Sequence, residues 1–155
     1  MNWQPAKLGM AMLLIAESVF FFMLIVAFVY FRDESLKASA ATLNVRITSI
    51  YTACLLISGL ALWRARLALA VLFGGIFLAG QGTEYMRMLR KGVTMSQGLF
   101  GTTFFTLAGM HGLHVLIGLG LLLGLRRSGA ISMFWQFVVA SWVVIFAVVY
   151  LWSFA

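Results

Sequence analysis

Three ionisable side chains lie inside apolar stretches of the sequence, where they could bind or exchange protons. Glu17 lies nine residues beyond Leu8, where an apolar run begins, at a depth of about 14 Å along a helix. His111 and His114 are three residues apart in another apolar run, so a helix places both on one inward-pointing face. An ionisable group in hydrocarbon is energetically expensive and is a functional candidate by default. We therefore expect proton handling, lipid binding or a partner contact at these positions.

The two apolar runs are expected to cross the membrane in opposite directions. Residues just past the middle of the second run then return to the depth of Glu17, and we hypothesise a hydrogen bond between Glu17 and a histidine. The bond is either direct or mediated by water or a lipid headgroup. The structural alternative is that Glu17 is protonated or hydrogen-bonded in the bundle, and that each histidine bonds a neighbouring helix or a backbone carbonyl.

The chain has too few ligands for a redox centre of its own. Two axial haem ligands lie on opposite faces of the iron, and two histidines on one helix face cannot supply both. A copper or zinc centre needs three or four close His or Cys ligands, whereas the chain has two histidines and the single Cys54. The sequence therefore predicts no catalytic residue, no metal site and no cofactor in this chain.

Glu84 is a fourth candidate, near the end of another apolar run and three residues after Gln81. The two residues occupy adjacent turns of the expected helix. This pair could order a lipid headgroup or a loop. Equally, a carboxylate near a membrane interface is often only solvated, and the sequence leaves both interpretations open.

The elements that carry these residues are expected to be transmembrane helices. Of the 155 residues, 63% are apolar and 10% are charged, unlike a soluble domain. A span needs roughly 20 apolar residues, and the charged residues separate runs of about that length. We predict an all-α fold, a polytopic bundle of five transmembrane helices in one domain. The expected spans are residues 8–31, 47–63, 67–86, 99–125 and 132–154.

The formal net charge of +7 comes from residues at the ends of these spans and in short loops. Such residues normally hold helix ends at lipid headgroups, so we expect membrane lipids and no nucleic acid as partners. Five basic residues fall on one side of the membrane and six on the other, so local charge does not decide the orientation. Small residues four apart, such as Gly120 and Gly124, permit close helix packing.

Three blocks of the sequence resemble subunit III of the haem-copper respiratory oxidases, the cytochrome c oxidase subunit III family, in its short five-helix bacterial form. The first is LGMAMLLIAESVFFF at residues 8–22. The second is QGTEY at residues 81–85, followed by GLFGTTFFTLAGMHGLHVLIG at residues 98–118. The third is WQFV at residues 135–138 together with Trp142. The resemblance extends over nearly the whole chain and is weakest between Arg32 and Arg46.

Two positions of the last span depart from the family pattern. Gln136 and Val139 stand where the family usually has His and Asp, so the polar contacts of that pair are missing or rebuilt. This departure favours a divergent oxidase, or a subunit III-like accessory subunit of a quinol oxidase or nitric oxide reductase.

The resemblance implies a non-catalytic subunit of a terminal oxidase in aerobic respiration. Subunit I, which would hold the haem and copper, and subunit II are the expected partners, and phospholipid is the expected ligand. The family is also expected to support proton uptake and stability during turnover. The resemblance further implies a bacterial inner membrane, with the N-terminus cytoplasmic and the C-terminus periplasmic or external. Lipid-binding or proton-linked roles fall on Glu17, Glu84, His111 and His114, and partner contacts on Trp135 and Trp142.

A small proton-coupled transporter is the alternative from another functional class. A single Glu in a first helix can alternate between a proton and a cationic substrate. The fifth span and the His-Gly-Leu-His block argue against this alternative. Neither the electron donor nor the terminal acceptor can be predicted from the sequence.

Overall fold

A computed structural model describes residues 5–30, 45–91, 99–125 and 128–151 of the chain. These residues form long helices and contain no strand. The helices are α1 (Pro5–Tyr30), α3 (Val45–Trp63), α4 (Leu67–Arg90), α5 (Leu99–Gly124) and α6 (Gly129–Phe146), and a π-helical turn, η1 (Ala147–Leu151), follows α6. Among the residues described, five helices are long and apolar enough to cross a membrane. The predicted all-α fold with five transmembrane helices is confirmed, and the chain is a multi-pass membrane protein.

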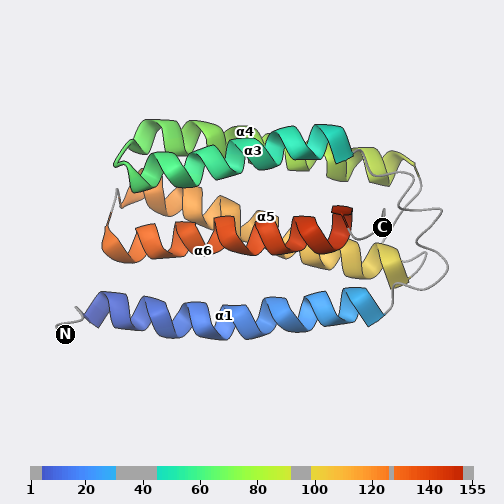
Figure 1. The fold of residues 1–155 in the computed structure, drawn as a ribbon, viewed down its shortest axis with the longest axis horizontal. Coiled ribbons are helices and arrows are strands. Elements are labelled where there is room, and N and C mark those ends of the chain that lie inside the picture. The colour runs from blue at the N-terminus through green and yellow to red at the C-terminus, as the bar shows by residue number, and fades with distance from the viewer. Residues whose placement is uncertain (1–4, 31–44, 92–98, 126–127, 152–155) are drawn as a thin grey trace.

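The helices lie in three layers (Figure 1). Helices α3 and α4 form one side, α5 and α6 lie in the middle, and α1 lies on the other side. Helix α6 packs against α1, α3 and α5, and α5 also packs against α1 and α4. The middle layer therefore contacts both outer layers.

Three helices differ by three or more residues at one end from the sequence prediction, and α3 and α5 differ by one or two. Helix α1 begins at Pro5 rather than Leu8, since proline is tolerated in a first turn whose N–H groups have no helical partner. Helix α4 continues past residue 86 to Arg90, because basic residues can extend a helix into the headgroup region and favour its C-terminal end. Helix α6 begins at Gly129, capped by Ser128, whose hydroxyl accepts a hydrogen bond from Ile131 N over 3.2 Å. The predicted ends at residues 31 and 154 lie outside the described residues.

Trp135 of α6 contacts α3 and α4 of the neighbouring layer and α5 of its own layer. Its indole is fully buried and donates from Nε1 to Ser58 Oγ over 3.1 Å, and Ser58 donates to Ala70 O over 2.7 Å. A Cβ on Gly74 or Gly118 would lie 2.8 Å or 2.7 Å from the Trp135 ring. Only glycine admits the indole at these two positions, which explains two of the glycines in the third and fourth spans.

Helices α3 and α4 are joined by a turn centred on Ala65, which has a left-handed φ of 61°. Arg66 N donates to Ala61 O over 2.8 Å, and Ala65 N donates to Leu62 O over 3.0 Å. These are the two bonds of a Schellman motif, whose left-handed position is usually glycine. The short turn keeps α3 and α4 together as a hairpin.

Candidate functional site

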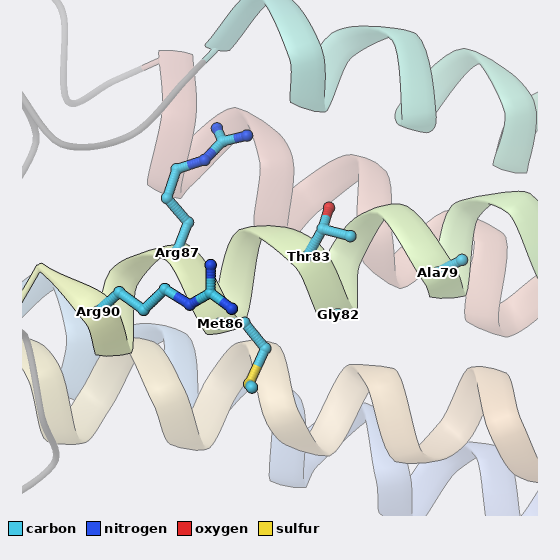
Figure 2. Close-up of a pocket in the computed structure, with 6 residues that line it drawn as sticks. All are labelled: Ala79, Gly82, Thr83, Met86, Arg87 and Arg90. Atoms are coloured by element: carbon cyan, nitrogen blue, oxygen red, sulfur yellow. The ribbon is translucent and has the colours of Figure 1, made fainter.

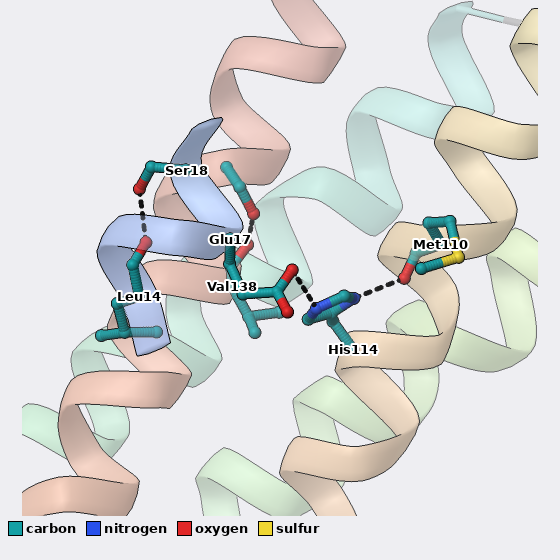
Figure 3. Close-up of polar contacts among 7 residues, drawn as sticks. Leu14, Glu17, Ser18, Met110, His114 and Val138 are labelled. Atoms are coloured by element: carbon teal, nitrogen blue, oxygen red, sulfur yellow. Dashed lines mark hydrogen bonds and ion pairs between the residues drawn. The ribbon is translucent and has the colours of Figure 1, made fainter. Parts of the chain in front are cut away.

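The candidate site is a contact between Glu17 of α1 and His114 of α5 (Figure 3). His114 Nε2 lies 3.2 Å from Glu17 Oε2, and His114 Nδ1 lies 2.7 Å from Met110 O. The structure therefore contains the hydrogen bond between Glu17 and a histidine that the sequence suggested, and it identifies His114 as the partner. Glu17 is twelve residues from Pro5, about 18 Å along α1 and close to the middle of the helix. This position is deeper than expected, since α1 begins earlier than predicted.

The two bonds of His114 determine where its protons lie. A backbone carbonyl can only accept, so Nδ1 carries a hydrogen and donates it to Met110. Nε2 then either accepts a hydrogen from a protonated Glu17 or donates one to an ionised Glu17. Both arrangements contain one proton shared by the two side chains and carry no net charge. An uncharged pair is suited to the membrane interior, where a single charge is expensive.

The two members of the pair differ in how far they are exposed. The side chain of His114 is 8% exposed and that of Glu17 is 27% exposed. The His114 ring is covered by Phe21 of α1, at a ring distance of 5.1 Å, and by Phe134 of α6 at 6.2 Å. The carboxyl group of Glu17 is therefore the more exposed side of the pair.

His111 lies one turn away from His114 but has a different environment. It is fully buried, and neither ring nitrogen has a hydrogen-bond partner among the residues the structure describes. Its ring stacks on Trp142 at 4.8 Å and contacts the edges of Phe77 at 5.9 Å and Phe21 at 6.4 Å. A lipid headgroup cannot reach a side chain in this position, so the burial argues against the lipid-binding role expected for His111.

Glu84 is also enclosed by the protein. It is 2% exposed, and its Oε2 accepts a hydrogen bond of 2.9 Å from Arg87 Nη1, one turn further along α4. Its neighbour Gln81 is buried as well. The carboxylate is therefore neither solvated nor open to a headgroup, and the exposed charges at this end of α4 belong to Arg87, Arg90 and Lys91. Neither Glu84 nor Gln81 is brought to Glu17, which contacts α5 instead.

Comparison with known proteins supports the resemblance. The chain is 33% identical over 97 residues to cytochrome c oxidase subunit 3 of Corynebacterium diphtheriae, covering 54% of this chain and 47% of that protein. It is 35% identical over 101 residues to cytochrome bo(3) ubiquinol oxidase subunit 3 of Pseudomonas aeruginosa, covering 56% and 48%. A longer match of 28% over 179 residues covers 96% of the chain and 89% of a probable quinol oxidase subunit 3 of Staphylococcus haemolyticus. No family model matches the chain.

The chain is a homologue of oxidase subunit 3. It spans about half the length of the first two relatives and most of the length of the third. The resemblance inferred from the sequence blocks is therefore confirmed.

The two departures of this subunit 3 homologue are accommodated by packing and by a different hydrogen bond. Gln136 Nε2 donates to Gly59 O of α3 over 2.9 Å. A Cβ on Gly59 would lie 3.2 Å from a methyl group of Val139, so Val139 packs closely on the same glycine. The amide of Gln136 thus makes a polar contact that joins α6 to α3.

Trp135 and Trp142, which were expected to contact a partner subunit, are fully buried inside the chain. Trp142 Nε1 donates to Thr52 Oγ1 over 2.9 Å, and Thr52 Oγ1 donates to Thr48 O over 2.8 Å. Both indoles therefore hold α6 against α3 and have no exposed surface to offer. The sequence placed both in the third block of the resemblance, but only the packing shows which way they face.

The described residues of the homologue contain no group of three or more His, Cys, Asp or Glu side chains that could hold a metal ion. The histidines are on one helix face, and one of them is already bonded on both nitrogens. Cys54 is on α3, whereas both histidines are on α5. The donor set does not fit haem or copper.

Proposed function

We propose that the chain is a non-catalytic accessory subunit of a haem-copper terminal respiratory oxidase in aerobic electron transport. It packs on subunit I, which carries the haem and copper, with subunit II as a further neighbour. It lies in a bacterial inner membrane with its N-terminus cytoplasmic and its C-terminus external. The names of its relatives support an oxidase complex, and the donor set of the described residues supports a role without a redox centre.

The Glu17–His114 pair is the observation that carries the proposal. The shared proton can pass between Glu17 and His114 without changing the net charge of the pair, and its release leaves one carboxylate on the partly exposed side. In the assembled oxidase the pair assists proton uptake and supports stability during turnover. The part of Glu17 that remains exposed is also accessible to phospholipid, the expected ligand of the subunit.

Purification through a tag on this chain tests the association. In mild detergent the tagged chain should bring down a partner with a haem absorption spectrum, whereas the chain separated from its partner in stronger detergent should show none. Haem bound stoichiometrically to the isolated chain would overturn the proposal. Relatives of both cytochrome c and quinol oxidases match the chain, so reduction of the purified complex by each donor class then identifies the electron donor.

A proton-coupled transporter remains the alternative because Glu17 is ionisable and partly exposed. Reconstitution of the isolated chain in liposomes separates the two functions. The oxidase proposal predicts no substrate-driven proton movement by the chain alone. Proton movement that is lost on Glu17→Gln, without any haem-containing partner in the purified material, would favour transport.

A further inference from the structure

The π-helical turn η1 directs Tyr150 into the interior of the bundle. Residues seven apart lie on nearly the same face of an α-helix, and Val143, seven residues before Tyr150, is 45% exposed. A continued α-helix would therefore carry Tyr150 on the exposed face. The π-helical turn holds more residues per turn and rotates the chain between these two positions, so that Tyr150 is fully buried. Such turns are rare and occur frequently at functional sites.

The hydroxyl group of Tyr150 faces polar side chains of two other helices. It is close enough to Thr48 of α3 and to Gln81 and Glu84 of α4 to interact with them, and all three side chains are buried. The hydroxyl nevertheless reaches hydrogen-bond geometry with no described residue. A buried hydroxyl without a hydrogen bond is destabilising, and buried polar groups are normally bonded to protein or to ordered water. The Tyr150 hydroxyl therefore requires a further partner.

His111 also has unbonded polar atoms in the described interior, but its surroundings are different. Both residues flank Trp142, His111 at a ring distance of 4.8 Å and Tyr150 at 6.4 Å. The rings of Trp142 and Phe77 cover His111, and its neighbour His114 is already bonded through both nitrogens. A buried water needs two to four polar partners. The surroundings of Tyr150 supply that number, whereas the aromatic surroundings of His111 do not.

Glu84 connects the surroundings of Tyr150 with the surface of the bundle. Its Oε2 accepts a hydrogen bond from Arg87 over 2.9 Å, and the side chain of Arg87 is 37% exposed. Arg87 lines a hollow of about 610 Å³ on the outer face of α4, and Figure 2 shows it leaving the helix on the side opposite to Met86. This end of α4 extends past the apolar stretch into the headgroup region. Water at the membrane interface can therefore reach Arg87, directly beside the buried carboxylate.

We propose that one ordered water molecule is bound inside the bundle between Tyr150 and the buried polar side chains of α3 and α4. The Tyr150 hydroxyl and the Gln81 side chain bond to this water, and the Glu84 carboxylate accepts one of its hydrogens. With Thr48 nearby, the water has three or four polar partners, the usual number for a buried water. It fixes η1 against α3 and α4. The site lies on helices other than those of the Glu17–His114 pair and goes beyond the proposed function.

A structure of the purified complex at a resolution that shows ordered waters tests the site directly. We expect density for a water within about 2.5–3.2 Å of Tyr150 Oη and at the same distance from a side-chain atom of Gln81 or Glu84. Tyr150→Phe should lose this density and keep the ion pair of Glu84 with Arg87. A Tyr150 hydroxyl bonded directly to Gln81 or Thr48, with no water beside it, would overturn the proposal.

Thermal unfolding of the full chain in detergent gives a second test, in which the sign of the effect decides. With the water in place, Tyr150→Phe removes a bonded hydroxyl and should lower the midpoint by about 2–4 °C, the effect of one ordinary hydrogen bond in a chain of this size. A raised midpoint would contradict the proposal, because it would show that the substitution removes an unbonded polar group.

Tyr85→Phe on α4 is the matched control for this measurement. Tyr85 is only partly buried, so its hydroxyl does not depend on an internal water, and its variant should keep the wild-type midpoint. The unfolding test needs no partner subunit. Its result is therefore independent of whether the chain purifies with a haem-containing complex.

Discussion

The interior around α6 and the contact between α1 and α5 use polar side chains in different ways. In the apolar stretch of α6, 39% of the residues are buried within the chain, against 11% in α1. The indoles of Trp135 and Trp142 donate to hydroxyl groups on α3 and are fully enclosed. Glu17 instead makes its hydrogen bond to His114 from a helix that is mostly exposed. A polar group in mid-membrane is thus structural where it is enclosed and bonded, and a functional candidate where one side stays open.

The two histidines of α5 show the same difference between an enclosed and an open environment. His111 stacks in an aromatic interior, whereas His114 links α5 to α1 through Glu17. They are separated by one turn, and the neighbouring helices decide their roles. Mutations in the enclosed region should therefore affect stability, and mutations at the open pair should affect turnover.

The largest effect on stability is expected where Trp135 packs on glycine. Gly118→Leu places a side chain where even a Cβ would lie 2.7 Å from the indole, so the bundle must shift. We expect a loss of about 1–3 kcal/mol, the typical cost of overpacking, measured by unfolding in detergent. Gly120→Leu is the control on the same helix, since its Cβ would meet no atom within 4 Å. Equal stability of the two variants would contradict the packing described for Trp135.

A smaller effect is expected for the hydrogen bond between Trp142 and Thr52. A double-mutant cycle of Trp142→Phe and Thr52→Val isolates the pair from the packing lost in each single variant. The coupling should be about 0.6 kcal/mol, the average for side-chain hydrogen bonds between membrane helices. The same unfolding measurement gives this value. Additive effects would show that the 2.9 Å contact contributes nothing to stability.

The smallest effect, and of the opposite sign, is expected at the turn between α3 and α4. Ala65→Gly relieves the left-handed conformation that alanine adopts at a φ of 61°. Part of this gain is lost because glycine is more flexible in the unfolded chain. We therefore expect a net stabilisation of about 0.5 kcal/mol. A higher unfolding midpoint for the variant confirms the Schellman turn, and a lower midpoint would argue that the turn is not strained.

The sequence was sufficient to predict the helices because runs of apolar residues separated by charges follow directly from the thickness of the membrane. The hypothesised contact of Glu17 with a histidine also required little more than depth and direction. The choice between His111 and His114 was not predictable, since it depends on how α5 is rotated against α1. The burial of Glu84, Trp135 and Trp142 was also not predictable, because hydropathy does not distinguish a side chain facing lipid from one facing another helix.

Helix ends were less predictable, for local reasons. Charged residues were taken to end a span, yet the arginines at the end of α4 continue the helix beyond the apolar stretch. Ser128 is a capping residue that could have been found in the sequence, because serine before a helical run is a common N-cap.

The central claim is that the shared proton of Glu17 and His114 supports turnover in a complex whose haem is held elsewhere. In Glu17→Gln the amide can still donate to His114 Nε2, so the hydrogen bond is kept while the ionisable group is removed. Ser18→Ala is the matched control, since among the described residues Ser18 bonds only to Leu14 O, in its own helix.

The decisive measurement is the number of turnovers that the purified oxidase completes before it loses activity, with haem content determined on the same sample. We predict that Glu17→Gln keeps full haem content and a shorter active lifetime, while Ser18→Ala behaves as wild type. Loss of haem on Glu17→Gln, or an unchanged lifetime, would contradict the account.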